Sequence, residues 1–361
     1  MTSQADREAG HSLAWLHPGW AASGLGTGAL GTATLMLARS FPGADWVEVF
    51  AFGLLCVALL LSVGAVVLYG YRFVRHRRAL LADLNDPQLA PLFATLPGGL
   101  VVTAAGIAQL TTPLASPLPL AAVGVMGAIG LALSILVAAA FVIAMMAAGS
   151  GVVGSVTGVW FIPGTVVMLG VILLVSLSGP LGWMAPSTHE AGVLGGAGLG
   201  IGFGLTAVAG GMLAIRLIDR GTLPVSQQPS LFIVLSPLSI GAVATIMLIR
   251  QLVPADGGRA VWVVADLGAT MLWGFALFWA AICVVVLVPV LRRGLAFSPS
   301  WWAFVFPVAA FAEATLRIGQ VWPSLAVTWL GVAIWGVEVC IWAVVIMGLL
   351  RDTAAGRVSY R

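Results

Sequence analysis

The chain of 361 residues carries too few charged side chains for a soluble protein of that length. Sixteen basic residues, all arginine, and thirteen acidic residues make up 8% of the chain, whereas soluble domains contain about 25% charged residues. Apolar residues make up 60%, and the formal net charge is only +3. This composition excludes a soluble globular domain and a disordered chain, gives no indication of nucleic-acid binding, and is typical of a helical membrane protein.

Ten segments are long and apolar enough to cross a bilayer, for which a helix needs about 20 mostly apolar residues. Between them lie breaks with turn-forming residues, such as Phe41-Pro42-Gly43, Asn85-Asp86-Pro87 and Asp256-Gly257-Gly258. In chain order, the predicted spans are residues 14–38, 46–74, 92–111, 119–147, 153–178, 190–217, 230–252, 261–290, 299–320 and 324–350. We therefore predict an all-α polytopic membrane protein.

The arginines are distributed unevenly between the two sides of the predicted membrane. With the N-terminus in the cytoplasm, twelve fall on the inner side, and only Arg39, Arg250, Arg259 and Arg317 fall on the outer side. This is the direction of the positive-inside rule. The first residues lack the features of a signal peptide. We predict a cytoplasmic tail over residues 1–13, a ten-helix domain over 14–350 and a second cytoplasmic tail over 351–361, in the cell inner (plasma) membrane.

A proline recurs near the start of every odd-numbered span, at intervals of 79, 66, 74 and 70 residues. The five are Pro18, Pro97, Pro163, Pro237 and Pro307. Each proline-bearing span is followed by a longer span without proline well inside it. The repeat predicts five tandem helical hairpins that point the same way. Five like hairpins in one membrane predict a quasi-fivefold ring around a central pore.

Two interpretations of these prolines are open. Inside a helix, proline removes a hydrogen bond and bends the axis, and in hydrocarbon such a bend is tolerated where it is buried or faces a water-filled path. The five proline-bearing spans would then form an inner ring of bent helices that lines the pore. Alternatively, the prolines mark helix starts, where proline is favourable.

Two segments resemble the tellurite-resistance/dicarboxylate transporter family. They are His17-Pro18-Gly19-Trp20 running into Gly24-Leu25-Gly26-Thr27-Gly28, and Ser300-Trp301-Trp302-Ala303-Phe304-Val305-Phe306-Pro307. The family includes bacterial TehA proteins, fungal malate and sulfite exporters, and the slow-type anion channel of plant guard cells. The resemblance covers nearly the whole chain in span number, repeat and orientation. It implies a ten-helix, quasi-fivefold bundle, assembled as a homotrimer, whose central pore passes small anions.

The resemblance also implies that a phenylalanine of the ninth span, here Phe306, closes the pore. The family's usual Thr-Phe-Pro reads Val-Phe-Pro at this point. A phenyl ring in a narrow apolar pore blocks it and disfavours water, although span chemistry alone favours simple packing between helices. By the register of the repeats, we expect His17, Leu96, Ile162 and Ser236 near the Phe306 ring. His17, with an ordinary pKa of about 6.5, would make flux pH-dependent; a histidine at the cytoplasmic interface is the alternative.

Glu313 and Arg317 are the charged residues expected well inside the odd-numbered spans, and their spacing of four places them on one helix face, where they can pair. Glu313 is also the candidate for proton coupling. Two functions are therefore open: passage of small anions down their gradient, or proton-coupled export of C4-dicarboxylate, sulfite or tellurite. Asp266 and Glu338 fall on even spans, where contacts between helices are expected. We expect no cofactor, no metal site, no enzymatic activity and no nucleic-acid partner, only anions and the lipid bilayer.

Overall fold

The computed structural model describes residues 13–110, 120–178, 187–292 and 301–354. In these ranges every regular element is a helix, and ten helical spans are long and apolar enough to cross a membrane. The predicted all-α polytopic class and the number of spans are thus confirmed, and each predicted boundary lies within five residues of the observed one. Most of both predicted tails lies outside the described residues, and the last helix runs on to Ala354.

The five odd-numbered spans are the buried ones: between 83% and 94% of the residues in the most apolar part of each lie inside the protein. Four of them begin as a 3-10 helix that leads into an α-helix. These are η2 (Pro18–Ala21) with α2 (Ala22–Ser40), η3 (Ala90–Ala94) with α5 (Thr95–Ala108), η6 (Gly158–Phe161) with α7 (Ile162–Ser178), and η7 (Val225–Val234) with α9 (Leu235–Leu252). The fifth is α11 (Trp302–Val321).

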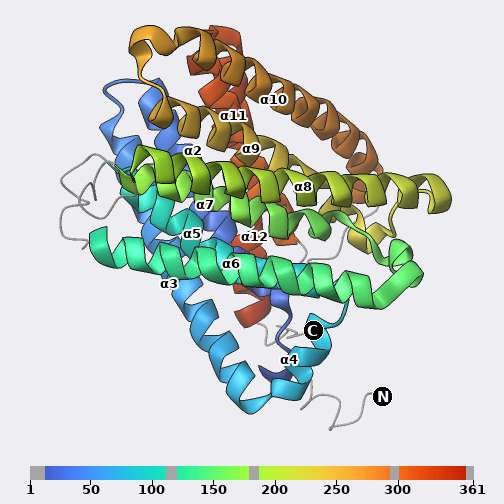
Figure 1. Cartoon of the computed structure of the whole chain (residues 1–361). Helices are drawn as coiled ribbons and strands as arrows, with labels where there is room; N and C mark the ends of the chain where they lie inside the picture. Colours follow the sequence, from blue (N-terminus) through green and yellow to red (C-terminus); the bar gives the residue numbers. More distant parts are fainter. Residues whose placement is uncertain (1–12, 111–119, 179–186, 293–300, 355–361) are drawn as a thin grey trace.

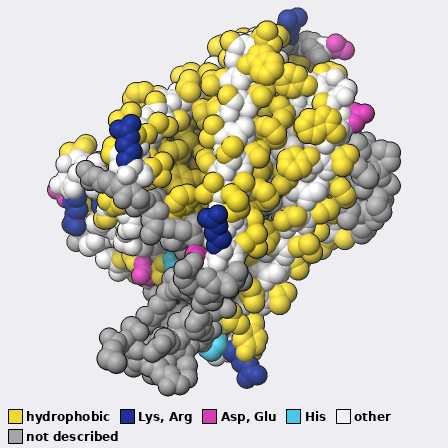
Figure 2. Space-filling view, turned by 180° about the vertical axis from the view of Figure 1, so that it is seen from behind, with side chains coloured by type: hydrophobic (Ala, Val, Ile, Leu, Met, Phe, Trp, Pro, Cys, Tyr) yellow, Lys and Arg dark blue, Asp and Glu magenta, His cyan; other side chains and the backbone are white. Residues whose placement is uncertain are grey.

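The five even-numbered spans are longer and lie on the outside of the molecule (Figure 1). They are α3 (Asp45–Arg75), α6 (Leu120–Ala148), α8 (Thr188–Arg220), α10 (Ala255–Arg292) and α12 (Leu325–Ala354). Only 17% to 28% of their most apolar residues are buried. The face seen in Figure 2 is mostly hydrophobic, with the few charged side chains mainly toward its borders. An apolar exterior of this extent matches a lipid-facing surface.

The buried helices contact one another in a fixed order. α2 packs against α5, α5 against α7, α7 against α9, α9 against α11, and α11 against α2. Each outer helix packs against the buried helix that precedes it in the chain. Small residues permit these close contacts: a Cβ atom on Gly26 would lie 2.8 Å from a Val305 methyl group, and one on Gly98 would lie 2.9 Å from a Val166 methyl group.

The five prolines do not occupy equivalent places in their helices. Pro18 is the first residue of η2, Pro163 is the second residue of α7, and Pro97 and Pro237 are the third residues of α5 and α9. In the first turn of an α-helix, an N–H has no partner within that helix, so proline costs little there. Pro97, Pro163 and Pro237, however, follow a 3-10 segment directly and lie within continuous helical spans, so both interpretations of these prolines stay open. Only Pro307 lies well inside its α-helix.

A short segment with polar contacts packs at the end of the molecule where the chain enters α2. It consists of η1 (Leu13–Trp15), the end of α3 and α4 (Arg77–Leu84). The buried Arg72 side chain donates from Nη2 to Asp83 Oδ2 at 2.6 Å and to the Ala14 carbonyl at 2.8 Å. Tyr69 donates its hydroxyl to the Leu16 carbonyl at 3.1 Å. A second connection, η5 (Gly149–Ser155), joins α6 to η6. These contacts hold the segment that carries His17.

Candidate functional site

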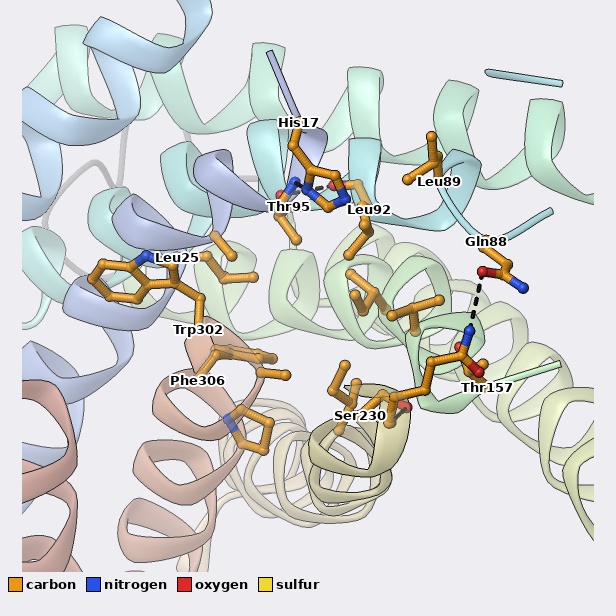
Figure 3. Close-up of a pocket in the computed structure, with 18 of the residues that line it drawn as sticks. His17, Leu25, Gln88, Leu89, Leu92, Thr95, Thr157, Ser230, Trp302 and Phe306 are labelled. Carbon is orange, nitrogen blue, oxygen red and sulfur yellow. Dashed lines mark hydrogen bonds between the residues drawn. The ribbon is translucent and has the colours of Figure 1, made fainter. Parts of the chain in front are cut away.

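A cavity of about 160 Å³ lies where the starts of all five buried spans meet (Figure 3). Each span contributes to its wall: His17, Ala22 and Leu25; Leu92 and Thr95; Thr157, Val159 and Ile162; Ser226, Gln227, Ser230 and Ile233; Trp302, Ala303, Phe306 and Pro307. Gly19, Gln88 and Leu89 complete it. Because five span starts gather at one place, the five buried helices run in the same direction.

Phe306 forms part of the cavity wall and also belongs to the hydrophobic core. Its side chain comes from α11, across the cavity from His17, with Trp302 one turn earlier on the same helix (Figure 3). Only 4% of Phe306 is exposed. It packs in the cluster that includes Leu25 and Ala310 and that fills the interior beyond the cavity. The aromatic ring therefore stands between the cavity and the apolar centre of the protein.

The structure brings His17 and Ile162, but not Leu96 and Ser236, to the cavity with Phe306. Leu96 packs with Leu16, Tyr69 and Phe93 on another side of its helix. Ser236 is fully buried, and its hydroxyl has no hydrogen-bond partner within the described residues. The reason is helical pitch. The spans change from three to 3.6 residues per turn near the prolines, so a register counted from the prolines does not give equivalent faces.

Most of the cavity wall is apolar, and its polar side chains, apart from His17 and Trp302, carry neutral amides and hydroxyls. Gln227 Nε2 donates to Gln88 Oε1 at 3.2 Å (Figure 3). Ser230 Oγ donates to the Gln227 carbonyl at 2.7 Å and accepts from the Gly158 N–H at 3.2 Å. His17 is the one titratable side chain among the described residues that line the cavity. The wall therefore offers hydrogen-bond donors without a fixed charge.

Sequence reasoning did not identify the residues Gln88, Thr157 and Gln227. They lie six to ten residues before Pro97, Pro163 and Pro237, in the segments that lead into the buried helices. A polar residue at this distance before each repeated proline was the available signal. It was not decisive, because nothing in one segment shows that the others lie beside it.

His17 is held in the orientation seen in Figure 3 by a backbone N–H of the turn that follows it. Its Nδ1 accepts a hydrogen bond from the Gly19 N–H at 3.0 Å and so caps η2. Burial lowers the pKa of His17, with Arg72 acting in the same direction and Asp83 opposing it. The fold therefore favours the neutral imidazole, since a protonated Nδ1 cannot accept the Gly19 hydrogen bond.

Glu313 and Arg317 form the pair that their spacing predicts, deeper in α11 than the cavity. Glu313 Oε1 lies 3.5 Å from Arg317 Nη2, and Glu313 Oε2 accepts a hydrogen bond from Thr32 Oγ1 at 2.9 Å. Glu313 is 4% exposed and does not line the cavity. It follows Phe306 by seven residues, which places the two side chains on nearly the same helix face.

The two carboxylates of the outer helices differ in their surroundings. Asp266 on α10 pairs with Arg250 of α9 at 3.2 Å. Glu338 on α12 is fully buried, and neither carboxylate oxygen has a hydrogen-bond partner within the described residues. Asp266 therefore connects two helices, as expected for an even span, and neither residue lines the cavity.

Comparison with known proteins assigns a family and a set of distant relatives. A family model described as voltage-dependent anion channel matches residues 15–350. An uncharacterized transporter of Methanocaldococcus jannaschii is 24% identical over 94% of this chain and 94% of its own length. A second uncharacterized transporter of that organism is 25% identical over 86% of this chain and 87% of its own length. A sulfite efflux pump of Arthroderma otae is 22% identical over 87% of this chain and 84% of its own length.

Proposed function

This chain belongs to the voltage-dependent anion channel family, and from that premise we propose that it passes small anions across the membrane along a path between its five buried helices. The observation that carries the proposal is the cavity bounded by the starts of all five, with Phe306 in its wall. In this proposal the buried helices form a quasi-fivefold ring, and the cavity is the inner mouth of a central pore.

In this proposal the inner mouth attracts anions although no described residue of its wall carries a fixed positive charge. The N-terminal end of a helix carries roughly half an elementary positive charge, and five such ends face the same small volume. Amide and hydroxyl donors replace part of the water around an anion, and no carboxylate lines the described cavity wall to repel it. Selectivity then follows how readily each anion gives up its water.

Phe306 is the proposed gate. Its ring lies at the junction between the cavity and the apolar core, where water is disfavoured even when space opens. The following residue, Pro307, lies inside α11. Proline removes one hydrogen bond of that helix and so permits α11 to bend next to the ring.

We expect Phe306→Ala to increase nitrate flux into liposomes by about tenfold or more, which corresponds to lowering the barrier by about 1.4 kcal/mol. Phe304→Ala is the matched control. Phe304 is also a buried phenylalanine of α11, but it packs against Phe232 with ring centroids 5.1 Å apart and does not line the cavity. Unchanged flux in a correctly inserted Phe306→Ala protein would contradict the gate.

The alternative is proton-coupled export of a dicarboxylate, sulfite or tellurite. It draws on the sulfite efflux pump among the relatives and on Glu313, a buried carboxyl group on the face of α11 that carries Phe306. Glu313 contacts Arg317 as an ion pair and accepts a hydrogen bond from Thr32. Anion flux that collapses an imposed voltage without moving protons supports the channel. Proton movement that Glu313→Gln abolishes supports the exporter.

We further propose a homotrimer in the plasma membrane with both termini in the cytoplasm. The mass of the detergent-solubilised protein, corrected for bound detergent, tests the trimer.

A further inference from the structure

Three arginines gather at the opposite end of the buried helices from the cavity. Arg39 lies in the last turn of α2, Arg250 in the last turn of α9, and Arg317 near the end of α11. Arg317 lies within electrostatic range of the other two. Hydrogen bonds tie these helix ends together: Arg39 donates to both the side chain and the carbonyl of Gln109, at 3.2 and 2.6 Å, and Gln320 donates to Ser40 at 3.0 Å.

Helical periodicity connects this cluster to the cavity. Residues seven apart lie on nearly the same face of an α-helix, about 10 Å along its axis. Leu25 lines the cavity, and Thr32 and Arg39 follow it at intervals of seven. Phe306 and Glu313 stand in the same relation on α11. Thr32 and Glu313 meet through their hydrogen bond, so the faces that line the cavity converge below it and lead to the arginines.

Arg317 has hydrogen-bond donors that no group within the described part of the chain satisfies. Its side chain is only 12% exposed, and its Nε and Nη2 make no hydrogen bond within the described residues. The contact with Glu313 at 3.5 Å is an ion pair without hydrogen-bond geometry, and the other oxygen of Glu313 is engaged by Thr32. Buried donors without an acceptor are destabilising. An anion beside Arg317 would provide the missing acceptor.

Acidic side chains surround the three guanidinium groups. Glu313 pairs with Arg317, Asp266 pairs with Arg250, and Asp45 and Glu48 line a cavity with Arg39. The C-terminal end of a helix carries roughly half an elementary negative charge. Without the arginines, the ends of five parallel helices would therefore repel an anion from this side.

We propose that Arg317, assisted by the positive charge of Arg39 and Arg250, binds a small oxyanion at this end of the path. A guanidinium group presents coplanar N–H donors that match an oxyanion such as nitrate. The site rests on the proposed function in one respect only: it is a second anion position on the same path, at the end away from Phe306.

The binding test uses the full-length protein in detergent, with nitrate affinity read from the rise in unfolding temperature over a nitrate series. The double variant Glu313→Gln with Arg317→Gln removes both charges of the pair and leaves no carboxylate unpaired. We expect its dissociation constant for nitrate to rise about tenfold, the usual factor for losing one charge-assisted hydrogen bond. Arg292→Gln, an exposed arginine at the end of α10, is the control and should keep the parent affinity.

An affinity equal to that of the parent in the double variant overturns the site. If the double variant does not fold, Arg39→Gln decides, because Arg39 is exposed and its hydrogen bonds go to Gln109 rather than to Glu313. Weaker nitrate binding in Arg39→Gln supports the site, and unchanged binding overturns it. Nitrate flux through Phe306→Ala is measured separately. Absence of that flux would refute the proposed path, while the binding result would still decide the arginine site.

Discussion

The helix cap formed by the His17 side chain makes the stability of the protein depend on pH. His17 Nδ1 caps η2 by accepting from Gly19, and this role requires a neutral imidazole. Burial lowers its pKa from the ordinary 6.5. The native protein therefore binds this proton more weakly than the unfolded chain. The stability that the neutral imidazole contributes is fully present above pH 6.5 and is lost as the pH falls below that value toward the lowered pKa.

We expect the unfolding temperature of the parent protein to fall as the pH is lowered from about 6.5 to about 5, the side of the ordinary histidine pKa on which this stabilisation is lost. The unfolding temperature of His17→Asn should fall less over the same pH range, because an asparagine oxygen can cap the same N–H without titrating. His17→Ala should lower the free energy of unfolding by about 1 kcal/mol at the higher pH, the usual cost of removing a cap. An equal pH dependence in the parent and in His17→Asn would rule out His17 as the titrating group.

At the scale of elements, the crossing of η6 over η7 fixes one wall of the cavity. Gly158 begins η6, and a Cβ atom placed there would overlap the Ser230 carbonyl oxygen. The Gly158 N–H also donates to Ser230 Oγ at 3.2 Å. Thr157 and Ser230 face the cavity from these two elements. Any side chain at position 158 would therefore separate the elements and widen the site.

Gly158→Ala should destabilise the protein by at least about 3 kcal/mol, because the overlap is with backbone and cannot be relieved by a rotamer change. Gly204→Ala is the matched control. Gly204 lies in the outer helix α8, and nothing stands within 4 Å of a Cβ added there, so the change should be within about 0.5 kcal/mol. The unfolding temperatures of both variants in one detergent make the comparison. Parent-like stability of Gly158→Ala would show that the two elements can move apart freely.

The element boundaries were largely predictable, whereas the role of the prolines was not. Runs of apolar residues and the turn residues between them located all ten spans. The choice between a bend and a helix start at Pro97 or Pro237 depends on where 3-10 geometry changes to α geometry. That change follows from packing between spans, so it has no signal within one span.

At the scale of the whole molecule, the alternation of buried and lipid-facing spans requires a defined orientation in the membrane. The cavity lies on the side of α4, which carries Arg77 and Arg78 beside the last turn of α3. From the positive-inside rule we propose that this side faces the cytoplasm. An anion would then enter at the neutral cavity from the cytoplasm and meet the arginine cluster on the other side.

Single cysteines test this orientation in a protein whose natural Cys56, Cys283 and Cys340 have been replaced by serine. Pro42 lies between α2 and α3, and Asn85 follows α4; both are exposed. In intact cells, a membrane-impermeant maleimide should label Pro42→Cys, and it should label Asn85→Cys only after permeabilisation. The reverse pattern would place the cavity on the outer side.

Sequence alone determined the membrane class, the ten spans and the fivefold repeat, and it predicted the Glu313–Arg317 pair; the importance of Phe306 is implied by the family resemblance of its segment. Each of these depends on composition, on a period along the chain or on a short local motif. Only the tertiary structure decided which residues meet: Gln88 with Gln227, Gly158 with Ser230, and Thr32 with Glu313, the last pair 281 residues apart in the chain. Contacts between spans depend on the rotation of each helix about its own axis, which is set by how all the side chains pack together.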